Sequence, residues 1–271
     1  MKNVTFYIDQ AAIGIAPEDW TLKNSIELQR LYYIRGGRGR ILRDGGEPTE
    51  FEAGRIYLFP YNFFQRFEND PDDPIDHIYF DFISTPPIIA SEPIIYDVNA
   101  DSALHDILSA FEKLLPKRQK TWMDYPPMKR FGQVPDADSG SVGEYRQTVY
   151  SLFTAMLTML SSIREIPYSS DRLINAALEK IREDYKSQLS VAELAAGAGF
   201  EVNHFIRRFR KVMGVTPYAY LRSYRLMKAR GLVGSGHTLV EVAELVGYEN
   251  ASSLSRALAE LEKNNTERMH R

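Results

Sequence analysis

The feature that most constrains the fold of this chain is an internal repeat near its C-terminal end. Residues 190–200 align with residues 238–248 at a constant offset of 48. Each copy opens on a hydroxyl residue with a glutamate three positions later, the capping box that marks the start of a helix. Each also places an alanine four residues before a glycine, where the alanine allows close helix packing and the glycine relieves a tight turn. The repetition predicts two equivalent helical units in tandem.

Beyond the turn, the repeat resumes at an offset of 49 residues. There Phe205, Arg207 and Phe209 align with Leu254, Arg256 and Leu258. Two short helices joined by a tight turn, with a basic residue on the second, are typical of a helix-turn-helix. Thr216 and Pro217 predict a further helix over 218–233, because threonine caps helices well and proline suits the first turn. This helix would fix the separation of the units, so that they reach successive major grooves about 34 Å apart.

Charge is distributed unevenly along the 271 residues, whose net charge is −3. Residues 171–271 hold 16 Lys and Arg against 12 Asp and Glu, whereas the first 170 residues hold 17 against 24. Residues 202–240 contain no acidic residue and eight basic ones, Arg207, Arg208, Arg210, Lys211, Arg222, Arg225, Lys228 and Arg230. A basic segment on an acidic protein indicates phosphate binding, although a solvated helix face explains the charge alone equally well.

The first hundred residues contain short runs that are typical of strands. Residues 31–34, 55–59 and 77–82 are rich in aromatic and β-branched residues, and turn residues separate them. Helical periodicity follows over 101–170, with one apolar stripe between Leu104 and Leu115 and another between Val149 and Ile163. The second stripe either packs on the protein's own barrel or pairs with a second copy of the chain.

Length and pattern together predict an α+β protein with two domains. An antiparallel β-barrel over residues 1–100 is followed by a helical linker and dimerisation region over 101–170. An all-α double helix-turn-helix domain then occupies 171–271. There is no cysteine for a disulfide, a thiolate zinc site or a nucleophile. The N-terminus lacks the apolar run of a signal peptide, and no run approaches the ~18–20 residues that span a bilayer, so we expect a cytoplasmic protein without membrane contact.

Residues 190–258 resemble the DNA-binding domain of AraC/XylS-type transcription regulators. The resemblance rests on SVAELAAGAGF at 190–200, HFIRRFRKVMGVTPYAYLRSYRLMKAR at 204–230 and VAELVGYENASSLSRAL at 242–258. The stretch from LYYIRGGRGRI to HIYFDF is similar to the cupin-like effector domain of many such regulators. This second resemblance implies a cupin-like jelly roll, and the family implies a dimer contact through the middle helices.

Carried over by position, the family's DNA-reading residues fall on two helices. In the first unit they are Asn203, Ile206 and Arg207, with His204, Arg210 and Lys211 nearby. In the second unit they are Ala251, Ser252, Ser255 and Arg256, with Asn250 at the start of the helix. Arginine pairs well with guanine and asparagine with adenine, whereas small hydroxyl residues meet either phosphate or base edges. We therefore expect the second unit to read less sequence than the first.

The sequence departs from the family after Leu258. The family usually continues with a phenylalanine, a glycine, a Ser-Pro pair and a final tyrosine, whereas this tail contains Glu260, Glu262 and Glu267. We hypothesise that the second unit is weakly stable or leaves DNA contact mainly to the first.

Cupin folds also house metal enzymes, whose ions need three or four converging donors. The barrel region offers only His77, Gln65 stands where the family often has histidine, and His105 falls in the helical region. We predict no enzymatic activity, no catalytic residue, no metal and no cofactor. The resemblance implies a small-molecule pocket instead, for which the candidate residues are Arg30, Tyr32, Tyr57, His77 and Tyr79. Aromatic faces beside polar groups suit a small polar effector such as a sugar, although each residue is also an ordinary strand former.

The predicted function is that of an effector-responsive transcription regulator that binds promoter double-stranded DNA as a homodimer. Two alternatives remain open. One is a cupin enzyme with a vestigial C-terminal domain. The other is a ligand-binding protein with a degenerate DNA-binding domain that acts through protein partners.

Overall fold

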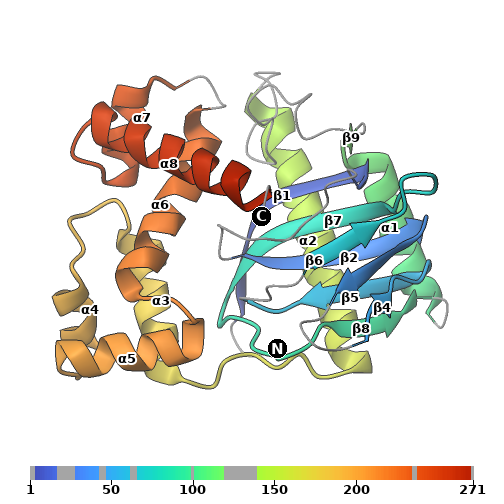
Figure 1. The fold of residues 1–271 in the computed structure, drawn as a ribbon, viewed down its shortest axis with the longest axis horizontal. Coiled ribbons are helices and arrows are strands. Elements are labelled where there is room, and N and C mark those ends of the chain that lie inside the picture. Colours follow the sequence, from blue (N-terminus) through green and yellow to red (C-terminus); the bar gives the residue numbers. More distant parts are fainter. Residues whose placement is uncertain are drawn as a thin grey trace.

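The computed structural model describes residues 4–16, 28–42, 47–61, 66–98, 101–118, 139–233 and 237–269. Strands occupy the first part of the chain and helices the rest (Figure 1). The strands are β1 (Thr5–Ile15), β2 (Gln29–Gly36), β3 (Gly39–Leu42), β4 (Thr49–Glu50), β5 (Arg55–Phe59), β6 (Arg66–Asn69), β7 (Asp76–Thr85), β8 (Ile94–Asp97) and β9 (Lys117–Arg118). The runs predicted at 31–34, 55–59 and 77–82 are confirmed as parts of β2, β5 and β7.

The strands form two sheets. One has six strands in the order β8-β5-β2-β7-β1-β9, and the other has three in the order β4-β3-β6. All pairings are antiparallel except that of β9, which runs parallel to β1. Side chains alternate between the faces of a strand. In the central strands β2, β5 and β7, one set of residues therefore packs toward the first two helices and the other set toward the smaller sheet.

Helices α1 (Ser102–Leu114) and α2 (Ser139–Ile163) bury their apolar stripes on the larger sheet. Asp101 caps α1 by accepting from the backbone N–H groups of Ala103 and Leu104. Phe153 of α2 is fully buried, with ring centroids 4.8 Å from Phe80 and 5.0 Å from Phe82. The stripe of α2 thus packs on the protein's own sheet. Val149, Phe153, Met156, Leu157 and Leu160 of the stripe are buried in this way and leave no surface for a seam between two copies, whereas Ile163 at the end of the helix is exposed.

Six helices form the C-terminal part, on one side of the sheets (Figure 1). They are α3 (Arg172–Asp184), α4 (Val191–Gly197), α5 (Val202–Met213), α6 (Pro217–Val233), α7 (Leu239–Val246) and α8 (Ala251–Met269). The predicted linking helix is confirmed as α6. The last of them, α8, runs as one helix through the segment where the sequence departs from the family and ends at Met269. None of the helices in the described ranges is long and apolar enough to cross a membrane.

The strand region and the C-terminal helices share an apolar core. Leu28, Tyr61 and Ile83 from the strand region belong to one buried cluster with residues of α3, α4, α5 and α6. The rings of Tyr61 and Tyr220 lie 6.1 Å apart. The chain that connects α2 to α3 is also held by the strand region, since Ile89 N–H donates to Pro167 O and Ser169 N–H to Pro87 O. These contacts fix the C-terminal helices against the sheets.

Candidate nucleic-acid interface

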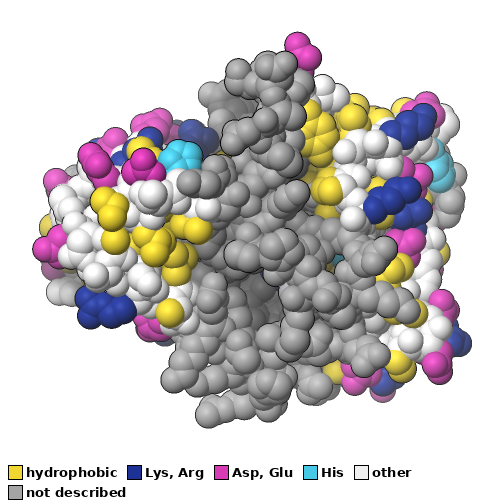
Figure 2. All heavy atoms as spheres, turned by 90° about the horizontal axis from the view of Figure 1, so that it is seen from above, with side chains coloured by type: hydrophobic (Ala, Val, Ile, Leu, Met, Phe, Trp, Pro, Cys, Tyr) yellow, Lys and Arg dark blue, Asp and Glu magenta, His cyan; other side chains and the backbone are white. Residues whose placement is uncertain are grey.

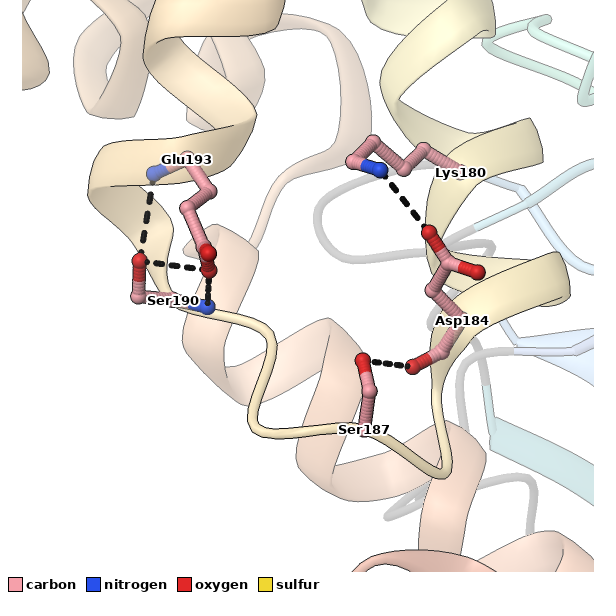
Figure 3. A network of polar contacts seen from close by, with 5 residues as sticks. All are labelled: Lys180, Asp184, Ser187, Ser190 and Glu193. Atoms are coloured by element: carbon pink, nitrogen blue, oxygen red, sulfur yellow. Dashed lines mark hydrogen bonds and ion pairs between the residues drawn. The ribbon is translucent and has the colours of Figure 1, made fainter.

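The two predicted units have the same start. In the first unit, Ser190 N–H donates to Glu193 Oε2 at 2.7 Å and Glu193 N–H returns a bond to Ser190 Oγ at 3.1 Å (Figure 3). In the second, Thr238 and Glu241 make the same pair of bonds, at 2.8 and 3.3 Å. The bonds from the capping residue lower the pKa of each glutamate. Both capping boxes predicted from the repeat are confirmed.

The turns that follow are also equivalent. Gly199 and Gly247 have φ angles of +70° and +78°, a left-handed conformation that favours glycine. In each unit the aromatic residue after the glycine donates its backbone N–H to the carbonyl of the small buried alanine, Ala195 at 2.9 Å or Ala243 at 2.8 Å. These bonds satisfy carbonyls at the helix end and fix the angle at which the second helix leaves.

Helix α5 separates its buried and exposed faces cleanly. Phe205, Phe209 and Met213 are fully buried. The opposite face is exposed and consists of Asn203, His204, Arg207, Arg210 and Lys211. Ile206 lies half-buried at the edge of this face. Glu201 caps the helix by accepting from the N–H groups of Asn203 and His204, which leaves both side chains outside the cap. The candidate DNA-reading residues of the first unit therefore lie together on one accessible surface.

Helix α8 is the counterpart of α5 in the second unit, and its exposed face carries fewer charged side chains. Leu254 is fully buried like Phe205, while Ser252, Ser255 and Arg256 are exposed and Ala251 is half-buried. The side-chain oxygen of Asn250 accepts from Ser253 N–H at 2.9 Å, so this residue caps the helix. The structure thus gives Asn250 a structural task that the resemblance did not imply. Glu262, Glu267 and Gln65 lie outside the described side chains.

Much of the basic segment forms contacts within the protein. Arg208 Nε lies 2.8 Å from Asp171 Oδ2, and Arg222 pairs with Glu260. Arg225 donates to the carbonyls of Tyr185 at 2.7 Å and Ser187 at 2.6 Å. Of the basic residues between 202 and 240 whose side chains are described, the exposed ones are Arg207, Arg210 and Lys211, all on α5. On the face of the C-terminal helices in Figure 2, acidic and apolar side chains lie among the basic ones.

The candidate effector residues also share a face. Register places Tyr57, Tyr32 and Tyr79 side by side on β5, β2 and β7, with Arg30 and His77 one row away on either side. All five therefore point toward the smaller sheet. Arg30 Nε lies 2.8 Å from Asp81 Oδ1, so Asp81 joins the five candidate residues on this face. Among the described residues, no three His, Asp or Glu side chains converge as a metal ion would require.

This inner face is aromatic and tightly packed. The ring of Tyr32 lies 5.0 Å from that of His77 and 5.2 Å from that of Phe59. Burial lowers the pKa of His77 to about 4, and the hydrogen bonds to the backbone of Gly14 and Ile75 only partly oppose this effect. His77 is therefore neutral near pH 7. The Arg30–Asp81 pair supplies the charge at one end of the aromatic surface.

Comparisons with known proteins agree with this geometry. Residues 194–265 match a family described as "Helix-turn-helix domain". The uncharacterized HTH-type transcriptional regulator YisR of Bacillus subtilis is 24% identical over 170 residues, which cover 59% of this chain and 58% of YisR. The HTH-type transcriptional activator RhaS of Klebsiella pneumoniae is 28% identical over 107 residues, which cover 38% of each protein. The chain thus spans about half or less of these relatives' lengths.

A solved structure shares the overall fold. Apo ToxT from Vibrio cholerae superposes with a TM-score of 0.50 at 11% identity, covering 95% of this chain and 92% of that one. The likeness therefore extends over both the strand region and the C-terminal helices.

Proposed function

We propose that this chain is an AraC/XylS-type helix-turn-helix regulator that binds promoter DNA and alters transcription from the cytoplasm. The match of residues 194–265 to a helix-turn-helix family and the likeness to transcription regulators support this proposal. The single observation that carries the proposal is the exposed face of α5. Asn203, Arg207 and Arg210 lie there at spacings of four and three residues, opposite a fully buried aromatic face. A helix in the major groove presents its side chains in this way. The relatives that the chain matches are described as transcription regulators, which favours a regulator over the alternative of a cupin enzyme.

The test compares two arginines of the same helical region. Arg207→Ala removes an exposed guanidinium from the reading face, and we expect affinity for the DNA upstream of the protein's own gene to fall about 10- to 100-fold, the usual value of one bidentate base contact. Arg172→Ala removes the same charge from the exposed start of α3 and leaves affinity within about twofold. Gel shift or anisotropy at one fixed salt concentration measures both. Unchanged binding by Arg207→Ala would favour the alternative of a degenerate DNA-binding domain.

We further propose that the two sheets form a cupin-like barrel that receives a small polar effector such as a sugar. Support comes from the aromatic inner face and the Arg30–Asp81 pair. Sugars stack on aromatic rings, and their hydroxyl groups form hydrogen bonds with charged side chains. A thermal-shift screen of mono- and disaccharides tests the idea. We expect a stabilising sugar whose effect is lost in Arg30→Met and kept in Arg40→Met, which lies at the exposed Arg40–Glu68 pair. A panel without any shift contradicts a carbohydrate effector.

We also propose a homodimer that uses the outward face of α2. This face is exposed and uncharged at Ser151, Ala155, Thr158 and Ser162. The hydroxyl of Thr158 donates to the carbonyl of Thr154 on its own helix, so this hydroxyl does not need a polar partner across an interface. Light scattering at micromolar concentration should give a dimer that Ala155→Lys dissociates. A strict monomer with and without DNA would exclude this part of the proposal.

A further inference from the structure

Arg208 ties the candidate reading helix α5 to the start of α3. Its Nε donates to Oδ2 of Asp171 at 2.8 Å, and its guanidinium lies 5.3 Å from the centroid of the Phe200 ring, within the range of a cation–π contact. Phe200 follows Gly199 in the turn that leads into α5. The same ring lies 4.7 Å from that of His204, one helical turn before Arg208. One flank of α5 is therefore held by an ion pair and by contacts with this ring.

The carboxylate of Asp171 is itself fixed by other contacts. Its Oδ1 caps α3 by accepting from the N–H of Ile174 at 3.2 Å, while Oδ2 accepts from Arg208. The N–H of Asp171 donates to Ser169 Oγ at 3.3 Å. Ser169 is in turn bound to the strand region, since its N–H donates to Pro87 O at 2.8 Å. Arg208 thus connects α5 with α3 and, through Ser169, with the strand region.

This ion pair requires less ordering than an ordinary surface pair. An exposed pair contributes little to stability, because two mobile side chains must be ordered to form it. The Asp171 side chain is only 14% exposed and is already ordered as the cap of α3. The Arg208 side chain is 40% exposed, and the Phe200 ring restricts it from one side. The geometry therefore favours a contact that persists in solution.

The second unit has a different residue at this position. At the offset of 49 residues Arg208 aligns with Ala257, which is buried in the apolar cluster formed by α6, α7 and α8. A methyl group cannot form an ion pair, so the second unit is built without this contact. The arginine is therefore not a general requirement of the helix-turn-helix fold, and its task belongs to the first unit.

Arg208 lies where it can fix the rotation of α5 about its own axis. The buried rings of Phe205 and Phe209 hold the helix through apolar contacts, which have little directional preference. The ion pair on the flank adds a directional contact. Side chains reach about 5–6 Å from a helix axis, so a rotation of about 10° moves their ends by about 1 Å. Such a shift is enough to break a hydrogen bond between the neighbouring Arg207 and a base edge.

We propose that Arg208 is a positioning residue, which acts through Asp171 to fix the rotation of α5 and thereby the sequence specificity of the first unit. Its own guanidinium does not read DNA, because Asp171 and Phe200 hold it. Two adjacent arginines thus have different tasks, since the exposed Arg207 contacts a base and Arg208 holds the helix. This inference rests on the proposed function, because specificity is defined by the DNA that α5 reads.

Two substitutions separate positioning from direct contact with DNA. Arg208→Gln removes the guanidinium. Asp171→Asn keeps the cap of α3, because asparagine caps helices as well as aspartate, but it removes the charge that holds Arg208. We expect each variant to lower affinity for the upstream DNA about 10-fold, and the double variant to lose no more than either one. An Arg208 that contacts DNA itself would be released by Asp171→Asn, so affinity that is unchanged or higher in this variant overturns the proposal.

The ratio of affinities for the upstream DNA and for unrelated DNA distinguishes positioning from stability. We expect anisotropy at one salt concentration to find this ratio about 10-fold lower in both variants, because a small rotation preserves the phosphate contacts of non-specific binding. The matched control is Lys180→Gln, which breaks the exposed Lys180–Asp184 pair on α3 and should leave the ratio within about twofold (Figure 3). A loss of stability in urea with an unchanged ratio would give Arg208 a purely structural role and refute the positioning role.

The same measurement separates this inference from the proposed function. A wild-type protein that binds both DNAs equally refutes the proposed function and the positioning role with it. A wild-type preference that survives Arg208→Gln refutes the positioning role alone.

Discussion

Alanine at Gly247 tests how the second unit is seated on the first. Gly247 ends α7 with φ at +78°, and a Cβ built there lies 2.6 Å from the carbonyl oxygen of Lys186 and 2.8 Å from that of Tyr185. Gly199 occupies the same place in the first unit with φ at +70°, but a Cβ there meets nothing within 4 Å. The two glycines therefore share one backbone conformation and differ in their surroundings.

The difference sets the magnitude of each effect. Gly199→Ala carries only the strain of the left-handed conformation, about 1–2 kcal/mol of unfolding free energy. Gly247→Ala carries the same strain and must also displace a backbone carbonyl, which adds about 1–3 kcal/mol. The α3–α4 loop cannot yield easily, because Arg225 binds the carbonyls of Tyr185 and Ser187 on either side of Lys186.

Urea unfolding of both variants under identical conditions measures the effect. We expect similar m-values and a lower transition midpoint for Gly247→Ala than for Gly199→Ala. Equal losses of stability would refute the reasoning, since they would mean that the loop moves aside without cost.

Three further predictions follow from the site. Lys211→Gln should reduce the slope of log affinity for DNA against log salt by about one, whereas Arg208→Gln should leave it unchanged because Asp171 already holds that guanidinium; equal slopes would contradict this division. The pKa of His77 is about 4 in the folded protein and 6.5 when solvated, so the folded state loses stability as pH falls through this window. His77 contributes about 2 kcal/mol to the decrease in unfolding free energy between pH 7 and pH 5. Urea unfolding at both pH values should therefore find a decrease that is about 2 kcal/mol smaller in His77→Phe than in the wild type. Hydrogen exchange should be faster in α8 than in α5, and faster still in Glu260→Gln, which breaks the pair with Arg222. Equal protection of the two helices would show that the second unit is not the weaker one.

Local patterns in the sequence were sufficient for the helices of the two repeated units and for three of the strands. Capping boxes, left-handed glycines and a Thr-Pro helix start depend on residues a few positions apart, and each was found where predicted. The exposed face of α5 follows from helical spacing in the same way. Strand phase was not predictable, yet the five candidate effector residues lie on one face because β2, β5 and β7 pair in register.

Contacts between segments that are distant along the chain could not be predicted from the sequence. The absence of acidic residues from 202–240 indicated a free basic surface, but Asp171 and Glu260 come from other helices to pair with Arg208 and Arg222. Lys228 was counted among the phosphate-binding cations, and only the fold places it on Tyr7 of β1. Strand β1 has a bulge at Asp9, whose position depends on the register between β1 and β7, which no local pattern specifies.

The apolar core that the strand region shares with the C-terminal helices limits how such a protein can be recombined. Leu28, Tyr61 and Ile83 pack with residues of α3, α4, α5 and α6 in one cluster. A chimera that joins these C-terminal helices to another protein's strand domain would have to supply side chains of matching shape, or leave an apolar surface exposed to water. Exchange of either part between related proteins should therefore succeed only where both halves of this cluster are transferred together.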